Sequence, residues 1–213
     1  MRAIIFANGE LRHPESVAAL IQDGDYIIAA DGGSRHCAQL GITPDLVVGD
    51  FDSIDEAELH ALQISGTRLV RYDRRKDFTD LELALEHARK IGASKTLVFA
   101  ALGRRWDQTL ANLLLPAVQT LSGLEVRLID GKQEIFLLRG GESCSLEGSL
   151  GDTISLIPLT REAQGVLTQG LEYPLKRETL YLGATRGISN MFSDSQASVF
   201  LEEGMLLICV LRQ

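Results

Sequence analysis

Leu46-Val47-Val48-Gly49-Asp50-Phe51-Asp52-Ser53 is the stretch that decides the fold of this chain. Its apolar half predicts a buried strand, and two carboxylates spaced two residues apart follow the strand's carboxyl end. Extended backbone would aim Asp50 and Asp52 to one side and Phe51 to the other. Two like charges held together favour a cation, and Mg²⁺ takes carboxylate ligands. A metal-free acidic turn explains these residues equally well, because Asp, Gly and Ser favour turns.

The chain as a whole has an ordinary globular composition. Its 213 residues, of which 45% are hydrophobic and 23% charged, suffice for one large domain or two small ones. No apolar run approaches the roughly 18 residues of a membrane span, so we expect no membrane partner. The net charge of −8 argues against a nucleic-acid partner. Three scattered cysteines without metal-ligand spacing indicate a reducing, cytoplasmic compartment.

Around the opening stretch, apolar runs alternate with amphipathic segments. The predicted strands are Arg2–Ala7, Tyr26–Ala30, Leu46–Gly49, Thr67–Tyr72, Lys95–Ala101 and Glu125–Ile129. The predicted helices are Pro14–Ile21, Ser34–Leu40, Ile54–Ile64, Asp77–Ile91 and Asp107–Leu121, where Pro116 should kink or end the last one. This alternation predicts an α/β domain over residues 1–130 with a mostly parallel, Rossmann-like sheet covered by helices.

After about residue 131, short β-prone runs punctuated by Gly, Ser and Thr replace the helical pattern. These runs are Glu134–Leu138, Thr153–Pro158, Val166–Thr168, Leu180–Leu182, Val199–Leu201 and Met205–Leu211. They predict a small all-β sandwich domain over residues 131–213.

Ligand-type residues follow five of the predicted strands. They are Asn8-Gly9, Asp31-Gly32-Gly33, Asp50-Phe51-Asp52, the segment from Arg74 to Asp80, and the segment from Gly103 to Gln108. In a parallel sheet the carboxyl ends of the strands share one edge, where ligands gather. Five such segments on one edge are hard to attribute to turn chemistry alone, and they favour a binding site.

Each motif by itself leaves an alternative open. Asp31-Gly32-Gly33 could offer backbone N–H groups to an anion, although a ligand-free turn explains an isolated motif better. Asp77 is best explained as a helix N-cap, whereas Asp80 could be a metal or substrate ligand. Gly103-Arg104-Arg105 suits phosphate, because arginine forks onto phosphate oxygens, but a solvated basic turn is equally compatible.

The remaining motifs narrow the chemistry. The sequence contains neither a G-x-S-x-G elbow nor a G-x-x-x-x-G-K-[ST] loop, and it offers no nucleophile–base pair. It does offer carboxylates for metal, together with arginines and glycines for phosphate. This set is typical of phosphoryl-type transfer, in which positioning and charge stabilisation provide most of the catalysis.

In their order along the chain, these motifs resemble the thiamine pyrophosphokinase family. The likeness runs through Ala30–Gly33, Pro44–Ser53, Asp77–Asp80, Gly103–Gln108 with Asn112, Gly170–Leu175 and Arg186–Asn190. It implies transfer of diphosphate from ATP to the hydroxyethyl group of thiamine, leaving AMP, with Mg²⁺ as cofactor. It also implies a homodimer, with a thiamine pocket at the dimer interface that uses the β domain.

The resemblance also implies roles for individual residues. Metal ligands would be Asp31, Asp50, Asp52 and Asp80. The ATP site would add Gly32, Gly33, Asp77, Thr79, Gly103, Arg105 and Asp107. The thiamine site would use Gln108, Asn112, Tyr173, Ser189 and Asn190, with Tyr173 stacking on the cationic ring. The catalytic residues would be Asp50, Asp52, Asp80 and Arg105, with Arg105 offsetting charge on the AMP leaving group and Asp80 a candidate base.

Two positions depart from the family pattern, and three other functions compete. Arg104 stands where the family usually has glycine, and Gln108 where many bacterial members have histidine. The competing functions are a diphosphokinase acting on another alcohol such as a hydroxymethyl pterin, a metal-dependent phosphohydrolase, and a non-catalytic nucleotide-binding regulator. The match of Tyr173, Ser189 and Asn190 to the thiamine enzymes favours thiamine.

Overall fold

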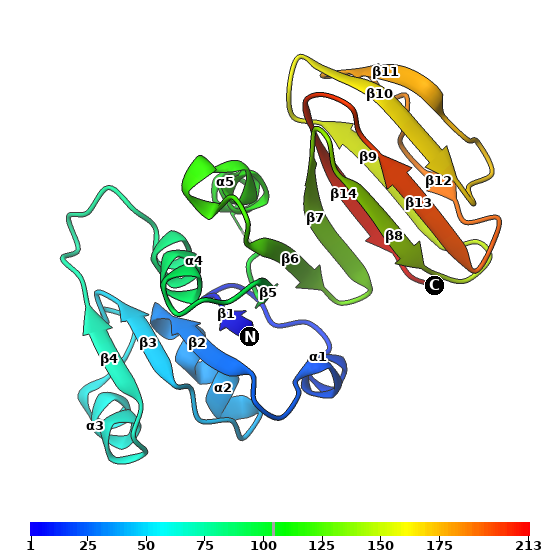
Figure 1. The fold of residues 1–213 in the computed structure, drawn as a ribbon. Helices are drawn as coiled ribbons and strands as arrows, with labels where there is room; N and C mark the ends of the chain where they lie inside the picture. The colour runs from blue at the N-terminus through cyan, green and yellow to red at the C-terminus, as the bar shows by residue number, and fades with distance from the viewer. Residues whose placement is uncertain (104) are drawn as a thin grey trace. The chain divides into compact units, whose positions relative to one another are not determined.

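The computed structural model describes residues 1–103 and 105–213, and the chain divides into two compact units (Figure 1). Unit 1 is Met1–Gly131 and unit 2 is Lys132–Gln213. Among the described residues, no helix is both long enough and apolar enough to cross a membrane.

Unit 1 is built on a parallel sheet with the strand order β4-β3-β2-β1-β5-β6. The central strands β1, β2, β3 and β5 are almost entirely buried apolar runs, as expected for a sheet covered on both faces. The chain reverses its direction of travel across the sheet between β1 and β5, which creates a crevice at their carboxyl ends. The strands are β1 Arg2–Phe6, β2 Tyr26–Ala30, β3 Leu46–Gly49, β4 Arg68–Arg71, β5 Lys95–Phe99 and β6 Glu125–Asp130.

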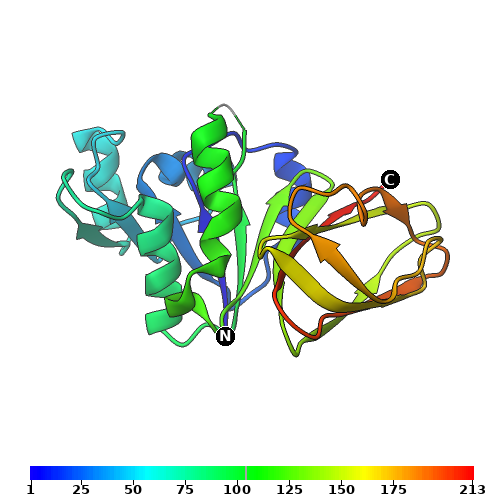
Figure 2. The same cartoon turned by 90° about the horizontal axis from the view of Figure 1, so that it is seen from above.

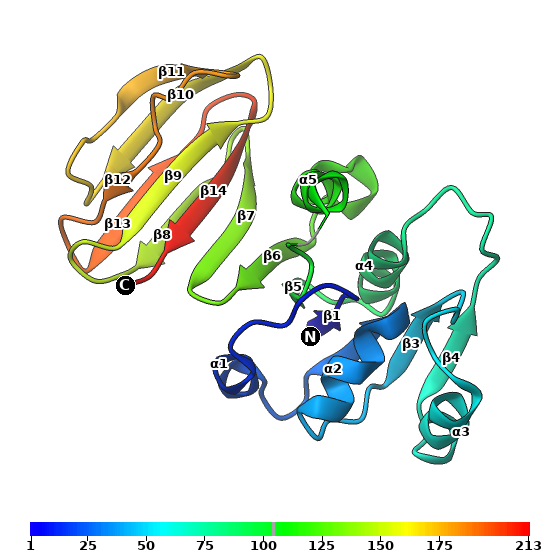
Figure 3. The same cartoon turned by 180° about the vertical axis from the view of Figure 1, so that it is seen from behind.

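Helices cover both faces of this sheet (Figures 1 and 3). One face carries α1 Pro14–Leu20, α2 Ser34–Gln39 and α3 Glu56–Ile64, and the other carries α4 Asp80–Lys90 and α5 Trp106–Leu114. Helix α4 packs on β1, β2 and β3 through its buried apolar side chains, which include the predicted stripe of Leu81, Ala84, Leu85 and Ala88. These layers confirm the predicted α/β fold.

Two predicted helix boundaries lie three or more residues from those in the structure, although the prediction that Pro116 kinks or ends the last helix is confirmed. Helix α5 ends at Leu114 and is followed by 3₁₀ turns at Leu115–Ala117 and Gln119–Leu121, because Pro116 cannot continue the α-helix. Helix α4 begins at Asp80 rather than Asp77. Its N-cap is Thr79, whose Oγ1 accepts a hydrogen bond from the Glu82 N–H at 3.2 Å.

Unit 2 is an antiparallel β-sandwich, which confirms the second part of the predicted fold (Figure 2). One layer has the strand order β12-β9-β14-β7 and the other β11-β10-β13-β8. The core contains alternate residues from both layers, such as Leu156 and Ile208 from one and Val166 and Val199 from the other. The strands are β7 Gln133–Arg139, β8 Ser143–Glu147, β9 Thr153–Pro158, β10 Glu162–Gln169, β11 Lys176–Tyr181, β12 Asn190–Met191, β13 Gln196–Phe200 and β14 Met205–Leu211.

Candidate functional site

Three aspartates lie together at the carboxyl ends of β2 and β3, and we call them the acidic cluster. Asp31 directly follows β2, whereas Asp50 and Asp52 follow β3. One carboxylate oxygen from each residue lies within 4.8 Å of the other two. These oxygens are close enough to share a single metal ion.

The backbone brings Asp50 and Asp52 together by a turn, so the predicted extended conformation of this segment is wrong. Phe51 has a φ of 65°, in the left-handed region. The Asp52 N–H donates to Asp50 Oδ1 at 3.0 Å and closes the turn. The Phe51 side chain is buried in the core of unit 1. It therefore anchors the turn, while its acidic neighbours remain accessible.

Asp31 is the most deeply buried member of the acidic cluster. The residue is 4% exposed, and its Oδ1 has no hydrogen-bond partner among the described residues. Its other oxygen accepts a long hydrogen bond of 3.5 Å from the Asn8 amide. A buried carboxylate oxygen without a partner is costly, and a bound cation would remove that cost. The cluster therefore fits a hard divalent ion such as Mg²⁺.

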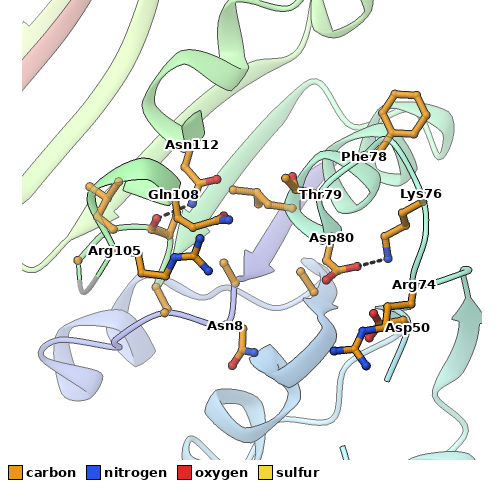
Figure 4. Close-up of a pocket in the computed structure, with 18 residues that line it drawn as sticks. Asn8, Asp50, Arg74, Lys76, Phe78, Thr79, Asp80, Arg105, Gln108 and Asn112 are labelled. Atoms are coloured by element: carbon orange, nitrogen blue, oxygen red, sulfur yellow. Dashed lines mark hydrogen bonds and ion pairs between the residues drawn. The ribbon is translucent and has the colours of Figure 1, made fainter. Parts of the chain in front are cut away.

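A pocket of about 570 Å³ opens beside this cluster, with Asp50 in its wall (Figure 4). Residues that follow β1, β3, β4 and β5 contribute to its lining, and β2 contributes its last residue, Ala30. The pocket lies at the reversal point between β1 and β5, where open α/β sheets bind ligands. Its lining is Ala7, Asn8, Gly9, Ala30, Asp50, Arg74, Lys76, Phe78, Thr79, Asp80, Leu81, Ala100, Ala101, Leu102, Gly103, Arg105, Gln108 and Asn112.

Asp80 and Lys76 form an ion pair in the wall of the pocket. Lys76 Nζ lies 2.6 Å from Asp80 Oδ1; the Lys76 side chain is largely buried and the Asp80 side chain is partly buried. Burial raises the pKa of Asp80, and the nearby charges of Asp31 and Asp50 add to this effect, while Lys76 opposes it. Asp80 is therefore electrostatically coupled to the acidic cluster, although its carboxylate is not one of the three that converge.

Arg105 enters the pocket from the segment between β5 and α5. Its guanidinium donates to Asp107 twice, from Nε to Oδ1 at 3.1 Å and from Nη2 to Oδ2 at 2.5 Å. This pairing lowers the pKa of Asp107. Asp107 does not line the pocket itself, but it is paired with Arg105, which does. Gly103 lines the pocket, whereas Arg104 lies outside the described residues.

Gln108 and Asn112 line the pocket from helix α5, and Figure 4 shows Gln108 on the same side as Arg105. The exposed Gln108 side chain is accessible to a ligand. Asn112 is buried, and its Nδ2 donates to the Ala101 carbonyl at 2.6 Å. Asn112 therefore ties α5 to the chain that follows β5.

Of the predicted ATP residues Gly32, Gly33, Asp77 and Thr79, only Thr79 lines the pocket. A Cβ on Gly33 would lie 2.0 Å from the Phe6 carbonyl oxygen, and one on Gly32 would lie 2.5 Å from Asn8. Packing against backbone therefore requires glycine at Gly33, whereas a side chain at Gly32 would displace the Asn8 side chain. Neither glycine lines the pocket. Thr79 does line it. Asp77 is exposed, lies outside the lining and is not the N-cap that the sequence predicted.

In unit 2, the three predicted thiamine residues lie close together. The Tyr173 side chain is exposed, whereas Asn190 is buried and hydrogen-bonded to the Tyr173 backbone. Ser189 is exposed with a φ of 56°, and its N–H donates to Ser155 Oγ at 3.0 Å. Asn190 is thus fixed beside Tyr173, and Ser189 precedes Asn190 in the chain and is held to β9.

Asn8, Arg74, Lys76 and Phe78 also line the pocket. The sequence placed them in ligand-type segments but predicted no individual role for any of them. Arg74 Nη2 lies 3.3 Å from Asp52 Oδ2, so it links the pocket wall to the acidic cluster. The sequence could have indicated the pairing of Lys76, because a lysine four residues before an acid can form an ion pair with it. Phe78 gave no comparable signal.

Comparison with known proteins gives matches along most of the chain. Residues 17–126 match the thiamin pyrophosphokinase catalytic domain, and residues 143–206 match the thiamin pyrophosphokinase vitamin B1 binding domain. The thiamine pyrophosphokinase of Bacillus subtilis strain 168 is 31% identical over 181 residues, which cover 85% of each chain.

Solved structures agree with these matches. The crystal structure of a Bacillus subtilis thiamine pyrophosphokinase superposes with a TM-score of 0.88 at 27% identity. A thiamin pyrophosphokinase family protein from Enterococcus faecalis gives 0.84 at 26% identity, and both comparisons cover 100% of each chain. The matched domains, the identity to the Bacillus subtilis protein and the shared fold together show that the chain belongs to the thiamin pyrophosphokinase family.

Proposed function

We propose that this member of the thiamin pyrophosphokinase family transfers the terminal diphosphate of ATP to the hydroxyl group of thiamine and releases AMP, with Mg²⁺ as cofactor. The observation that carries the proposal is the acidic cluster beside a pocket that also contains Arg74, Lys76 and Arg105. Carboxylates for a divalent ion and cations for phosphate oxygens are the two groups that such a transfer needs.

Asp31, Asp50 and Asp52 would hold the metal, and the partnerless Oδ1 of Asp31 supports this assignment. When bound, Mg²⁺ would neutralise phosphate charge and make the β-phosphorus more electrophilic. Asp80 is coupled to the same charges, so it is a candidate for a further ligand or for the base.

Arg74, Lys76 and Arg105 would orient the triphosphate. Lys76 and Asp80 lie across the pocket from Arg105 and Gln108 (Figure 4). Arginine binds phosphate oxygens through its planar fork, whereas lysine acts as a point charge. Asp107 fixes two guanidinium nitrogens of Arg105, which leaves the remaining N–H groups for the charge that develops on AMP.

In the transfer step, the hydroxyl oxygen of thiamine forms a bond to the β-phosphorus. The bond from the β-phosphorus to the oxygen that bridges to the α-phosphorus breaks, and AMP leaves with that electron pair. The hydroxyl proton is released, with the Asp80 carboxylate as the candidate acceptor. Phosphoryl-type transition states are loose, so positioning of the two substrates would provide most of the rate enhancement.

The thiamine side of the proposal assigns Gln108 and Asn112 in unit 1 and Tyr173, Ser189 and Asn190 in unit 2. Tyr173 is exposed, so its ring face is available for a flat cation. The match of residues 143–206 to a vitamin B1 binding domain supports thiamine as the acceptor. A pterin diphosphokinase, a phosphohydrolase and a nucleotide-binding regulator are not favoured.

A single assay tests the reaction. The protein is incubated with ATP, Mg²⁺ and thiamine, and AMP and thiamine diphosphate are quantified, with reactions lacking thiamine or containing a hydroxymethyl pterin as controls. We expect equal amounts of both products, loss of both with EDTA, and recovery with excess Mg²⁺. AMP formation only with another alcohol, or none at all, would refute the proposal.

The proposal includes a cytoplasmic homodimer. Cys37 and Cys209 are free thiols, which supports a reducing compartment. Exposed apolar side chains along α5 support self-association.

A further inference from the structure

Asn190 is bound to the backbone of Tyr173 on both sides of that residue. The Tyr173 N–H donates to Asn190 Oδ1 at 3.0 Å, and Asn190 Nδ2 donates to the Tyr173 carbonyl at 2.7 Å. The same Oδ1 also accepts from the Met191 N–H at 2.9 Å. One side chain thus holds the peptide groups before and after the Tyr173 ring.

These bonds use most of the hydrogen-bonding capacity of the Asn190 side chain. A carboxamide has two acceptor lone pairs and two N–H donors. Backbone groups occupy both lone pairs and one donor of Asn190, and the residue is only 6% exposed. Asn190 therefore cannot accept a hydrogen bond from a substrate without releasing the Tyr173 segment.

The rest of the segment around Tyr173 is fixed as well. The Glu172 N–H donates to the Met191 carbonyl at 2.9 Å. On the other side, the Leu175 N–H donates to Thr168 Oγ1 at 2.8 Å, and the buried Thr168 donates its own N–H to the Leu175 carbonyl at 3.0 Å. Unlike the hydrogen-bonded backbone around it, the side chain of Tyr173 faces solvent, and the residue is 55% exposed. An immobile backbone thus presents an exposed aromatic face.

We propose that Asn190 is a positioning residue, which acts on the substrate through Tyr173 and not by direct contact. The inference rests on the proposed role of Tyr173 as the platform for the cationic ring of thiamine. By holding both peptide groups of Tyr173, Asn190 fixes the backbone from which the ring projects before the ligand arrives. Less conformational freedom is then lost on binding, which favours affinity.

A double-mutant cycle tests this inference on the full chain. Asn190→Ala, Tyr173→Ala and the double variant are compared for KM and kcat with thiamine and, separately, with ATP. Losing a cation–π contact should raise the KM for thiamine by roughly 5- to 30-fold in Tyr173→Ala. We expect Asn190→Ala to raise it by a comparable or smaller factor, with the KM for ATP unchanged. In the Tyr173→Ala background, the second substitution should add no further increase.

Two outcomes would overturn the inference, and they are distinguishable. If Asn190→Ala raises the KM for thiamine by the same factor with and without Tyr173, then Asn190 acts on the substrate independently. If Tyr173→Ala itself leaves that KM unchanged, then the proposed platform is wrong and the inference falls with it.

Two further variants separate positioning from folding. Asn190→Asp keeps the size and the acceptor oxygen but loses the N–H that Tyr173 accepts, so it should also raise the KM for thiamine. Thr160→Val is the matched control. Thr160 follows the other end of β9, and its Oγ1 donates to the Glu162 carbonyl and accepts from the Met205 N–H. It should lower the melting temperature and leave both KM values unchanged. A rise in the KM for thiamine in Thr160→Val would show that general destabilisation produces the effect.

Discussion

At the scale of single residues, the accessible carboxylate of Asp52 provides the clearest test of the acidic cluster. Asp52→Asn keeps the shape of the side chain but removes the charge that a divalent ion needs. We expect turnover to fall by more than about 100-fold, since even residues that only support metal ligands often account for 10- to 100-fold. AMP release is the measurement, and thermal melting should show an intact fold.

The exposed Asp23 supplies the control for this substitution. Asp23→Asn makes the same chemical change outside the acidic cluster and should leave turnover unchanged. Near-native turnover in Asp52→Asn would remove Asp52 from the metal site.

Lys76 is the second residue with a sharp prediction, because it is largely buried and paired with Asp80 at 2.6 Å. Lys76→Ala would remove a cation that we propose binds phosphate, and it would leave the Asp80 charge uncompensated beside Asp31 and Asp50. We expect kcat/KM for ATP to fall at least about 10-fold, the effect of losing more than about 1.4 kcal/mol. Steady-state kinetics with ATP as the varied substrate provide the measurement.

Lys90 is a matched control for Lys76. It forms an ion pair of the same i, i+4 spacing with Glu86, at 3.2 Å on the exposed side of α4. Exposed pairs contribute little, so Lys90→Ala should leave kcat/KM unchanged. Equal losses in the two variants would show that Lys76 has no specific role at the pocket.

At the scale of helices and strands, most elements of unit 1 could be predicted from the sequence. Buried strands such as Tyr26–Ala30 and Leu46–Gly49 are apolar runs bounded by turn residues, and the structure has them with the predicted bounds. Strand β8, Ser143–Glu147, was missed because Leu146 is its only fully buried residue, so its pattern is mostly polar. Strand β12 has only two residues, too few for any period.

Local geometry at the site was harder to predict than the elements around it. The left-handed φ of Phe51 depends on burial of its side chain in the core, a tertiary effect that the pattern does not contain. Lys76 reaches the pocket through a segment without regular structure after β4. The position of such a segment depends on contacts between distant parts of the chain.

Asp152 links the chain before β9 to the chain after β14, and it gives a pH prediction. Its carboxylate accepts from the Ser149 N–H and the Gln213 N–H, each at 2.9 Å, and from Arg212 at 3.4 Å. These bonds, with Ser149 the largest contribution, lower the pKa of Asp152. Because the pKa of Asp152 is lowered in the folded state, its carboxylate stabilises the fold at pH values above the ordinary pKa of about 3.9. This stabilisation is lost as the pH falls through the lowered pKa.

We therefore expect Asp152→Asn to lower the free energy of unfolding by about 1–2 kcal/mol near pH 7. The difference from the unmodified protein should shrink below about pH 4, because the carboxylate of the latter becomes protonated there. Urea titrations of both proteins across this range provide the measurement. A difference that stays constant with pH would mean that the charge of Asp152 does not contribute.

At the scale of the whole molecule, the change of sequence period near residue 131 predicted an α/β fold followed by a β-sandwich, and the structure has both. The spacing of hydrophobic residues along a helix or strand shows which of its faces is buried within its own chain. It cannot show which exposed apolar surface another chain covers, so the expected homodimer came from the family resemblance and not from the pattern.

The exposed face of α5 makes this assembly testable. Trp106, Leu110 and Leu114 are exposed at a spacing of four residues, so they share one side of the helix. Soluble monomers rarely expose such contiguous apolar surface, and burying it against a second chain would stabilise a dimer. We expect light scattering to give twice the chain mass of 23.3 kDa. Leu114→Glu, which leaves the predicted ligand residues intact, should shift the protein to the mass of one chain.

Ile64 supplies the control, because it is an exposed apolar residue at the end of α3, on the opposite face of the sheet in unit 1. Ile64→Glu makes the same change away from α5 and should leave the mass unchanged. A Leu114→Glu protein that keeps twice the chain mass would show that α5 is not the interface. If instead it becomes a monomer and also loses transfer to thiamine while still binding ATP, the acceptor site requires the second chain, as the family resemblance implies.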